Sequence, residues 1–473
     1  MTGPLGNPHE IVHPGLRLSR VPSGRPLWLS YTIPWPDVPL LSLLGQVQER
    51  PRFYWSSSAH PVSLVGWGKA LELTDWGERR FRAIQSQVEH FSTRFFPLNP
   101  DAPAEVGPRW LGGFSFQSRP IEEPLWQAFP EAYFVLPRLQ LASLDGQVWL
   151  TINHLVEDAS DTTAIQAYFD ACLQEVNRLY TTPLSEKKTG KSQPVPFHAS
   201  LSEMTWQAMV AGALQHIQQG SFEKVVLART LQARLEEPLS IVDILERLAE
   251  RYPDCYRFML EPEPGQVFLG ASPELLAEVS APGFRSAALA GTIRRGNTPA
   301  EDARLGQALL DSAKDRLEHA IVVRAIQGKL ESLAETLEIA PAPTLRRLGN
   351  LQHLETAISG QLAPGWGVLD VAAALHPTPA LGGWPQQPAQ DYLTQAEPFS
   401  RGWYAAPIGW VDPWGNGIFA VAIRSGLISR QSVTLFAGAG IVGDSQPVKE
   451  WQETGLKFRP LLDAIGGRLP YGS

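Results

Sequence analysis

Phe222-Glu223-Lys224-Val225-Val226-Leu227-Ala228-Arg229 decides how the rest of the chain is interpreted, because it places a lysine inside the pattern of a buried strand. Alternate residues of a strand share a face, so Lys224 points to the same side as Val226 and Ala228. Two interpretations are open at this point. Either Lys224 ends an edge strand and reaches water through its long side chain, or it lies in a closed site and acts as a base.

The composition excludes several classes of protein. Of 473 residues, 44% are hydrophobic, and the net charge of −8 is well mixed along the chain, which argues against a nucleic-acid or membrane-surface partner. No segment has the length and apolarity of a membrane span, and the first residues lack the pattern of a signal peptide. We expect a soluble cytoplasmic protein, or a stromal one in a compartmented cell. Cys172 and Cys255 have neither zinc-site nor disulfide spacing and are expected to be core thiols.

The first part of the chain alternates short apolar or aromatic runs with turn residues, as expected for an antiparallel sheet. These runs lie at 53–56, 62–68, 113–116 and 133–139. Helical apolar spacing predicts helices over 78–92 and 163–179. The polar segment 181–200 is the best candidate for a linker.

Three helices are expected in the second part. Ser200 and Glu203 form a capping-box pattern for a helix that ends at Gly220. Thr298, Pro299 and Glu301 open a long helical stretch that continues to Ile326. The third helix starts at Pro447 and places Glu450, Glu453 and Lys457 on one side.

Several acids have both a functional and a structural interpretation. Glu274 follows a Ser-Pro turn and is either a catalytic acid or a first-turn helix residue. Glu318 lies near the apolar face of its helix, or is simply exposed beside a core histidine, His319. Glu318, Glu450 and Glu453 together suggest an oxygen-seeking ion such as Mg²⁺, and a solvated acidic helix face is the alternative.

Arg424 is a second cation within a strand pattern, and a bidentate clamp for a carboxylate is its natural functional role. Two glycine-rich turns, 289–292 and 437–441, offer backbone N–H groups to an anion, although neither has a dinucleotide or phosphate-loop pattern.

Taken in order, these motifs resemble the chorismate-utilising enzymes and, among them, the isochorismate synthases. The resemblance extends from Ser200 to about Leu462 and is looser before it. It rests on the stretches 222–229, 272–274, 290–296, 314–319, 376–383, 401–410 and 438–442, and on Glu453-Thr454.

The resemblance implies an α+β fold in which two mostly antiparallel sheets face each other, with helices outside and the active site in the central cleft. Residues 1–195 would contribute to the sheets and residues 196–473 would form the chorismate-binding catalytic region of one compact unit. The segment 382–400 is a candidate mobile cover over the site.

The implied reaction is a Mg²⁺-dependent exchange in which water adds at C2 of chorismate and the C4 hydroxyl leaves. Lys224 matches the general base and must be uncharged to act, while Glu274 matches the general acid. Each proton transfer is worth about 10²–10⁴-fold. Glu318 and Glu453 match the metal ligands, with Glu450 as a ligand or as a holder of metal-bound water.

The same resemblance assigns residues that hold the substrate. The pyruvyl carboxylate would be bound by Arg424, Tyr404 and the backbone from Gly438 to Gly440. The ring would be lined by Gly291, Thr292, His376, Ala380, Leu381 and Lys457.

Related enzymes provide the alternatives. Anthranilate and aminodeoxychorismate synthases add ammonia, and anthranilate synthases have no lysine at the position of Lys224, so water is the expected nucleophile and no glutaminase subunit is expected. Salicylate synthases carry the lysine and then eliminate pyruvate. The residues Ala380-Leu381 and the sequence of 222–229 favour release of isochorismate. A non-catalytic chorismate-binding paralogue is disfavoured because every charged position is retained. We expect a monomer or a weak homodimer.

Overall fold

A computed structural model describes residues 26–118, 124–182 and 195–469, together with Leu16, Leu18, Val21 and Pro22. Most of the linker expected over 181–200 lies outside these residues. The division of the chain at residue 195 stays a prediction.

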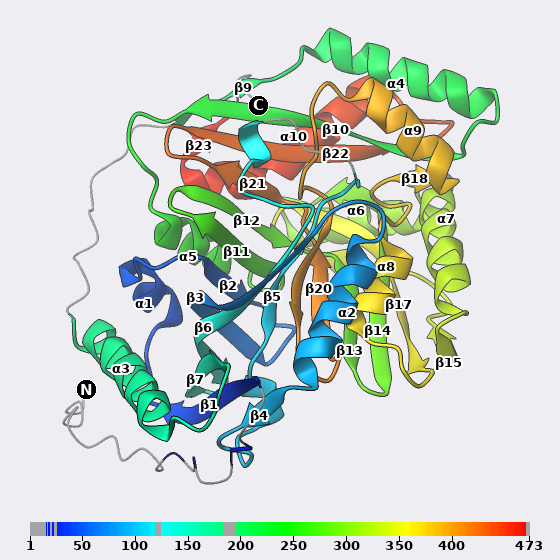
Figure 1. Cartoon of the computed structure of the whole chain (residues 1–473). Coiled ribbons are helices and arrows are strands. Elements are labelled where there is room, and N and C mark those ends of the chain that lie inside the picture. Colours follow the sequence, from blue (N-terminus) through cyan, green and yellow to red (C-terminus); the bar gives the residue numbers. More distant parts are fainter. Residues whose placement is uncertain are drawn as a thin grey trace.

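The strand that begins at Lys224 belongs to one arm of a large sheet (Figure 1). Every neighbouring pair in this arm is antiparallel. In order of pairing it contains β9 (His198–Ala199), β10 (Lys224–Arg234), β22 (Ser432–Ile441), β21 (Ser425–Ile428), β12 (Gln266–Ser272), β11 (Tyr256–Glu263), β2 (Arg52–Ser56) and β3 (Val62–Asp75).

A second antiparallel arm carries the other side of the molecule. It contains β5 (Trp110–Phe114), β19 (Pro407–Val411), β20 (Gly417–Val421), β13 (Leu275–Ser280), β14 (Gly283–Arg294) and β17 (Leu351–Leu362), and β17 pairs with both β15 (Ala334–Ile339) and β16 (Thr344–Arg347).

The long strand β6 (Ala132–Leu144) joins the two arms, because it pairs with β3 along one edge and with β5 along the other. The rest of its second edge pairs with β7 (Gln147–Val156), which leads to β1 (Leu27–Trp35) and the parallel β4 (Phe95–Pro97). β18 (Gly383–Trp384) adds to β10, and β8 (Val195–Pro196) pairs with β23 (Gly467–Arg468). The mostly antiparallel α+β architecture is therefore confirmed, with the described strands of both arms connected through β6.

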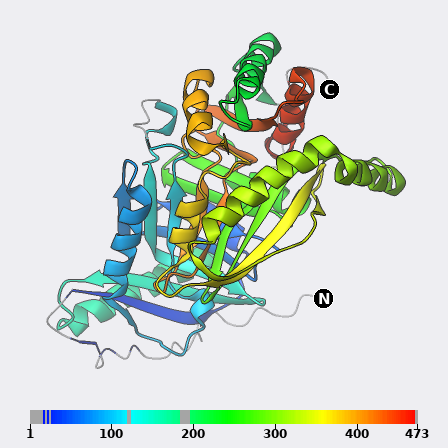
Figure 2. The same cartoon turned by 90° about the vertical axis from the view of Figure 1, so that its right-hand side faces the viewer.

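Helices cover the outside of the arms. In Figure 2 the long α7 crosses the sheet of β14 and β17, while α4, α9 and α10 lie together at the end of the molecule near β10. α2 and α8 pack side by side. The helices are α1 (Leu40–Gln46), α2 (Arg80–Ser92), α3 (Thr162–Thr181), α4 (Glu203–Gln218), α5 (Ile241–Arg251), α6 (Pro299–Asp311), α7 (Ala313–Leu330), α8 (Val368–Leu375), α9 (Gln386–Ala396) and α10 (Pro447–Ile465).

Two predictions about helix ends were wrong. The cap of α4 is Ser202, whose side chain accepts from Thr205 N–H, because Ser200 instead donates its hydroxyl to the carbonyl of Thr230 on β10. The long helix expected from Pro299 is two helices, since Ser312 caps a new one by accepting from Asp315 N–H.

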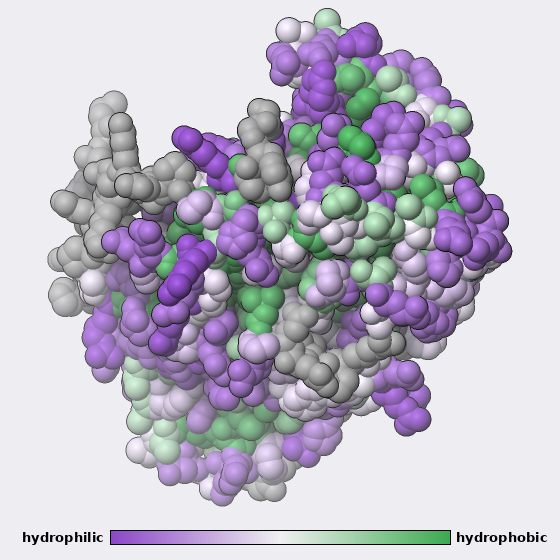
Figure 3. Space-filling model, turned by 90° about the horizontal axis from the view of Figure 1, so that it is seen from above, coloured by the Kyte–Doolittle hydropathy of each residue, from purple (hydrophilic) through white to green (hydrophobic). Residues whose placement is uncertain are grey.

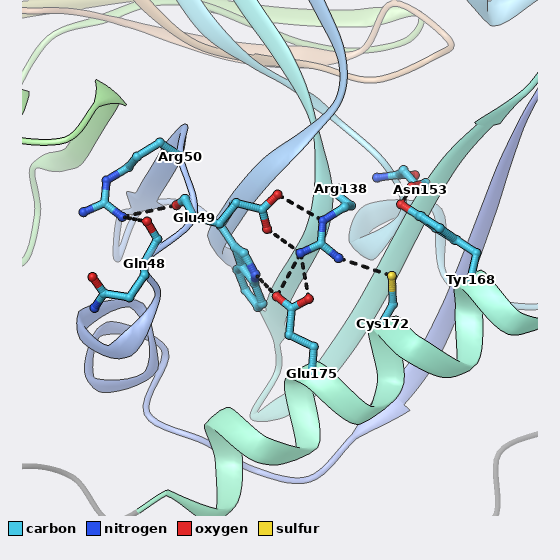
Figure 4. A network of polar contacts seen from close by, with 9 residues as sticks. Gln48, Glu49, Arg50, Arg138, Asn153, Tyr168, Cys172 and Glu175 are labelled. Carbon is cyan, nitrogen blue, oxygen red and sulfur yellow. Dashed lines mark hydrogen bonds and ion pairs between the residues drawn. The ribbon is translucent and has the colours of Figure 1, made fainter.

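A polar network far from β10 and β22 ties the N-terminal elements together (Figure 4). Arg138 on β6 is ion-paired with Glu175 of α3 at 2.8 Å and with Glu49, which follows α1. Its Nη1 also lies 3.3 Å from the sulfur of Cys172, a buried thiol as expected. One guanidinium thus links α3, β6 and the segment after α1.

The hydropathy of the surface is that expected for a chain with well-mixed charge. Figure 3 shows a face on which hydrophilic residues predominate and hydrophobic ones form small groups. Among the residues that the structure describes, no helix is both long and apolar enough to cross a membrane.

Candidate active site

A cavity lies where the two arms approach each other. β10 and β22 provide one wall and β14 and β17 the other, and the segments after β12 and β20 close it. It is lined by Val226, Pro273, Glu274, Leu289, Ala290, Glu318, His353, Ala380, Leu381, Tyr404, Ile423, Arg424, Gly438, Gly440 and Lys457.

Lys224 begins β10 and is buried, with 1% of its surface exposed. Its Nζ is 2.8 Å from Oε1 of Glu318, a residue of the cavity lining. The edge-strand interpretation is therefore wrong, because β22 and β18 pair with either edge of β10 at this end and the ammonium group does not reach water.

Gly440 allows this ion pair to lie against β22. A Cβ atom at position 440 would be 2.3 Å from Glu318 Oε1 and 3.2 Å from Lys224 Cε. Only a residue without a side chain leaves room for both groups there.

Glu274 lies between β12 and β13, so its interpretation as a first-turn helix residue is wrong. It is 5% exposed. Burial raises the pKa of this carboxyl to about 7, although the charges of Lys224, Arg424 and Lys457 act in the opposite direction. Near neutral pH a substantial fraction of Glu274 is therefore protonated, as a general acid requires.

The three predicted metal ligands come from α7 and α10, and each is paired with a lysine. Glu318 contacts Lys224, Lys314 Nζ lies 3.0 Å from Glu450, and Lys457 Nζ lies 2.6 Å from Glu453. Burial alone would raise the pKa of Glu318, but the nearby lysines lower it overall.

Electrostatics indicates that these acids lie close together. The pKa of Glu450 is raised by burial and then by the charge of Glu453. The pKa of Asp315 on α7 is also raised, by burial and by the charges of Glu318 and Glu453. Carboxylates are the oxygen donors that a hard cation such as Mg²⁺ prefers, so the chemistry of these side chains suits that ion. The described residues contain no cluster of three or more side chains already arranged as a metal site.

Arg424 and Tyr404, which were predicted to hold the pyruvyl carboxylate, both line the cavity. Arg424 follows β20 with a φ of 50° and is 7% exposed. Tyr404 is stacked on Phe436 of β22, and burial raises its pKa to about 12, so its phenol is a neutral donor. Lys457 donates to the carbonyl of Gly438 at 2.8 Å.

His353 of β17 lines the cavity and was missed by the sequence analysis. Its Nδ1 lies 3.2 Å from the carbonyl of Gly291 and 3.0 Å from Oγ1 of Thr292, and its Nε2 is 3.4 Å from Nη2 of Arg424. Burial and then the charge of Arg424 keep its pKa well below the usual value. A neutral ring that donates from Nδ1 to the Gly291 carbonyl can accept from Arg424 through Nε2.

Gly291 and Thr292 both contact His353, which lines the cavity, so they lie next to the cavity wall. Gly291 has a φ of 79° at an irregularity between β14 and β17, a backbone conformation that favours glycine. The signal available in the sequence was a histidine within the strand-like stretch 351–358.

The predicted site residues that do not themselves line the cavity are Lys224, Gly291, Thr292, His376, Glu450 and Glu453. Of these, His376 is directed away from the cavity. Its Nε2 donates to the carbonyl of Phe116 at 3.0 Å, and its ring lies near Phe81 of α2. The chain turns between His376 and Leu381, so Ala380 and Leu381 face the cavity while His376 faces the opposite side of the loop.

A family model described as chorismate binding enzyme matches residues 18–466 of this chain. The chain belongs to this family. It is 42% identical to the salicylate biosynthesis isochorismate synthase of Pseudomonas aeruginosa, over 90% of this chain and 88% of the relative. It is 38% identical to the isochorismate synthase MenF of Bacillus subtilis, over 88% of each chain.

Solved structures of chorismate-utilising enzymes have the same fold. The menaquinone-specific isochorismate synthase MenF from Escherichia coli matches with a TM-score of 0.77 and 26% identity, covering 95% of this chain and 97% of that chain. Anthranilate synthase component I from Streptococcus pneumoniae matches with a TM-score of 0.70 at 21% identity, which shows the shared fold alone.

Proposed function

We propose that this protein is an isochorismate synthase, an isomerase that converts chorismate to isochorismate. The observation that carries the proposal is that a buried lysine, Lys224, and a buried carboxylic acid, Glu274, both lie beside one cavity. Lys224 supplies an amine where water must be deprotonated, and Glu274 supplies a proton where hydroxide must leave. The names of the relatives support the same activity.

The reaction balances with these two groups. Lys224 takes a proton from water as the new C2–O bond forms. The two ring double bonds shift, the C4–O bond breaks, and Glu274 protonates the departing oxygen so that water leaves. The raised pKa of Glu274, about 7, lets it donate near neutral pH.

The substrate would be held by its two carboxylates. Arg424 and the phenol of Tyr404 suit the pyruvyl carboxylate, beside the backbone of Gly438 and Gly440, and Lys457 borders the same space. Ala380 and Leu381 give an apolar surface for the ring. His353 joins this set because it orients Arg424.

Mg²⁺ is the proposed cofactor, with Glu318 and Glu453 as ligands and Glu450 as a ligand or as an acceptor for a metal-bound water. When bound, it would neutralise the ring carboxylate and take up the negative charge of Glu318 that otherwise stabilises the Lys224 ammonium.

The test is incubation of the purified protein with chorismate and Mg²⁺, followed by chromatographic separation of the products. Isochorismate as the product supports the proposal. Salicylate and pyruvate would identify a salicylate synthase instead, and unchanged chorismate that nevertheless binds would identify a non-catalytic binding protein.

A further inference from the structure

The strand that carries Lys224 has an incomplete outer edge. β22 pairs with one edge of β10 along its whole length. On the other edge, β18 covers only 224–225 and β9 covers only 231–232. Backbone groups point alternately to the two edges of an antiparallel strand, so residues between these two short strands need other partners.

An ion pair fills this gap. Arg401 Nη2 donates to the carbonyl of Val226 at 2.5 Å, and the N–H of Ala228 donates to Oε1 of Glu397 at 2.8 Å. Together the two side chains present one donor and one acceptor to β10, as a neighbouring strand would. Glu397 directly follows α9, which packs beside β18 and β10 (Figure 1).

The same pair also holds the loop before β18, which borders the cavity next to β10. Arg401 Nη1 donates to the carbonyl of Leu381 at 2.9 Å. Leu381 and Val226 both line the cavity, and Lys224 is two residues before Val226 on the same face of β10. One guanidinium is therefore bonded to the strand of the base and to the loop that contacts the substrate ring.

The geometry of the pair leaves it little freedom. Arg401 Nε lies 2.8 Å and Nη2 2.5 Å from the two oxygens of Glu397, and both side chains are 4% exposed. The guanidinium also lies 4.4 Å from the ring centre of Phe116. Because the planar guanidinium is held by this many contacts, a displacement of Val226 also displaces Leu381.

We propose that the Glu397–Arg401 pair is a positioning element of the active site, which fixes the spacing between Lys224 and the Ala380-Leu381 wall. This role rests on the proposed isochorismate synthase activity. Neither residue is expected to touch the substrate. Loss of the pair misplaces the base relative to the ring, which lowers turnover more than substrate binding.

The chain offers a matched control. Arg52 on β2 is bonded to Glu261 of β11 through Nε at 2.6 Å and Nη2 at 2.5 Å, and its Nη1 donates to the carbonyls of Leu44 and Val47. This pair is also buried, but neither residue lines the cavity. Glu261 also contacts Arg50 Nε at 2.9 Å, so this is a second buried arginine–glutamate pair that lies outside the cavity lining.

The experiment compares Arg401→Lys with Arg52→Lys in the full-length protein with chorismate and Mg²⁺. We expect Arg401→Lys to lower kcat by about 10–100-fold with KM changed less than about threefold, since misplacement of about 1 Å has effects of this size. Arg52→Lys should lower Tm with a near wild-type kcat in the folded protein. Equal kcat effects from both variants, or an unchanged kcat for folded Arg401→Lys, would overturn the proposal.

Hydrogen exchange separates this proposal from the proposed function, because it needs no turnover. In Glu397→Ala, which removes the acceptor, the amide of Ala228 should exchange at least about tenfold faster, while that of Leu227, which faces β22, keeps its wild-type rate. An unchanged Ala228 rate contradicts the edge-filling role even if the wild type is active. An inactive wild type with the expected exchange pattern overturns the isochorismate synthase assignment and the positioning role of the pair, and retains the pair only as the partner of β10.

Discussion

Substitution of Gly440 by alanine is the most quantitative prediction for the site. The added Cβ would stand 2.3 Å from Glu318 Oε1 and 3.2 Å from Lys224 Cε. Normal contact requires about 1 Å more for the oxygen, so the Lys224–Glu318 pair must move by roughly that distance. A displacement of about 1 Å in a catalytic group lowers the rate by about 10²-fold, equal to about 2.7 kcal/mol of transition-state stabilisation.

Gly443→Ala is the control, because a Cβ at position 443 meets nothing within 4 Å and the position has no positive φ. The assay is steady-state conversion of chorismate with Mg²⁺, with thermal unfolding of each variant measured in parallel. Gly440→Ala should lose most of its kcat/KM and remain folded, and Gly443→Ala should match the wild type. Full activity in folded Gly440→Ala would refute the close approach on which the site assignment depends.

Four further predictions concern the same chemistry and the scaffold. Lys224→Met should lower kcat by about 10²–10⁴-fold in the turnover assay, and full activity would remove it as the base. The pH profile of kcat/KM should fall on the alkaline side near pH 7, because Glu274 with a pKa of about 7 must be protonated to donate; a rate that stays flat to pH 9 would contradict that role. EDTA should stop turnover and added Mg²⁺ should restore it, whereas turnover that continues in EDTA argues against a metal on Glu318 and Glu453. Gly328→Ala within α7, where a Cβ meets nothing within 4 Å, should raise the free energy of unfolding by about 0.5–1 kcal/mol in urea titrations, and a decrease would contradict the open surroundings.

Local patterns predicted the elements that carry the chemistry. The alternation around Lys224 predicted β10, and Pro447 predicted the start of α10, on which Glu450, Glu453 and Lys457 were expected to share one side. These features depend on neighbours within a few residues, which the sequence contains directly.

Features that depend on distant partners were harder to predict. Whether Lys224 is buried depends on β18 and β22, which are more than a hundred residues away. The inward orientation of His353 depends on the register between β17 and β14, and apolar spacing does not reveal this. The separation of α6 from α7 depends on the Ser312 cap, which interrupts an otherwise continuous helical pattern.

His376 illustrates a different limit. His376, Ala380 and Leu381 were assigned to the site from one motif, but a loop can present its residues to opposite sides. Ala380 and Leu381 line the cavity, and His376 is bonded to Phe116. Motif membership therefore identified a loop that borders the cavity without indicating which of its side chains face inward.

Turnover in oxygen-18 water tests whether Lys224 activates water for addition at C2 of chorismate. Isochorismate isolated at low conversion and analysed by mass spectrometry should carry one solvent oxygen in its new hydroxyl group, and Lys224→Met should form almost none of this product. Isochorismate that retains only the original chorismate oxygens would contradict the account, because the hydroxyl would then have moved within the substrate without any water for Lys224 to activate.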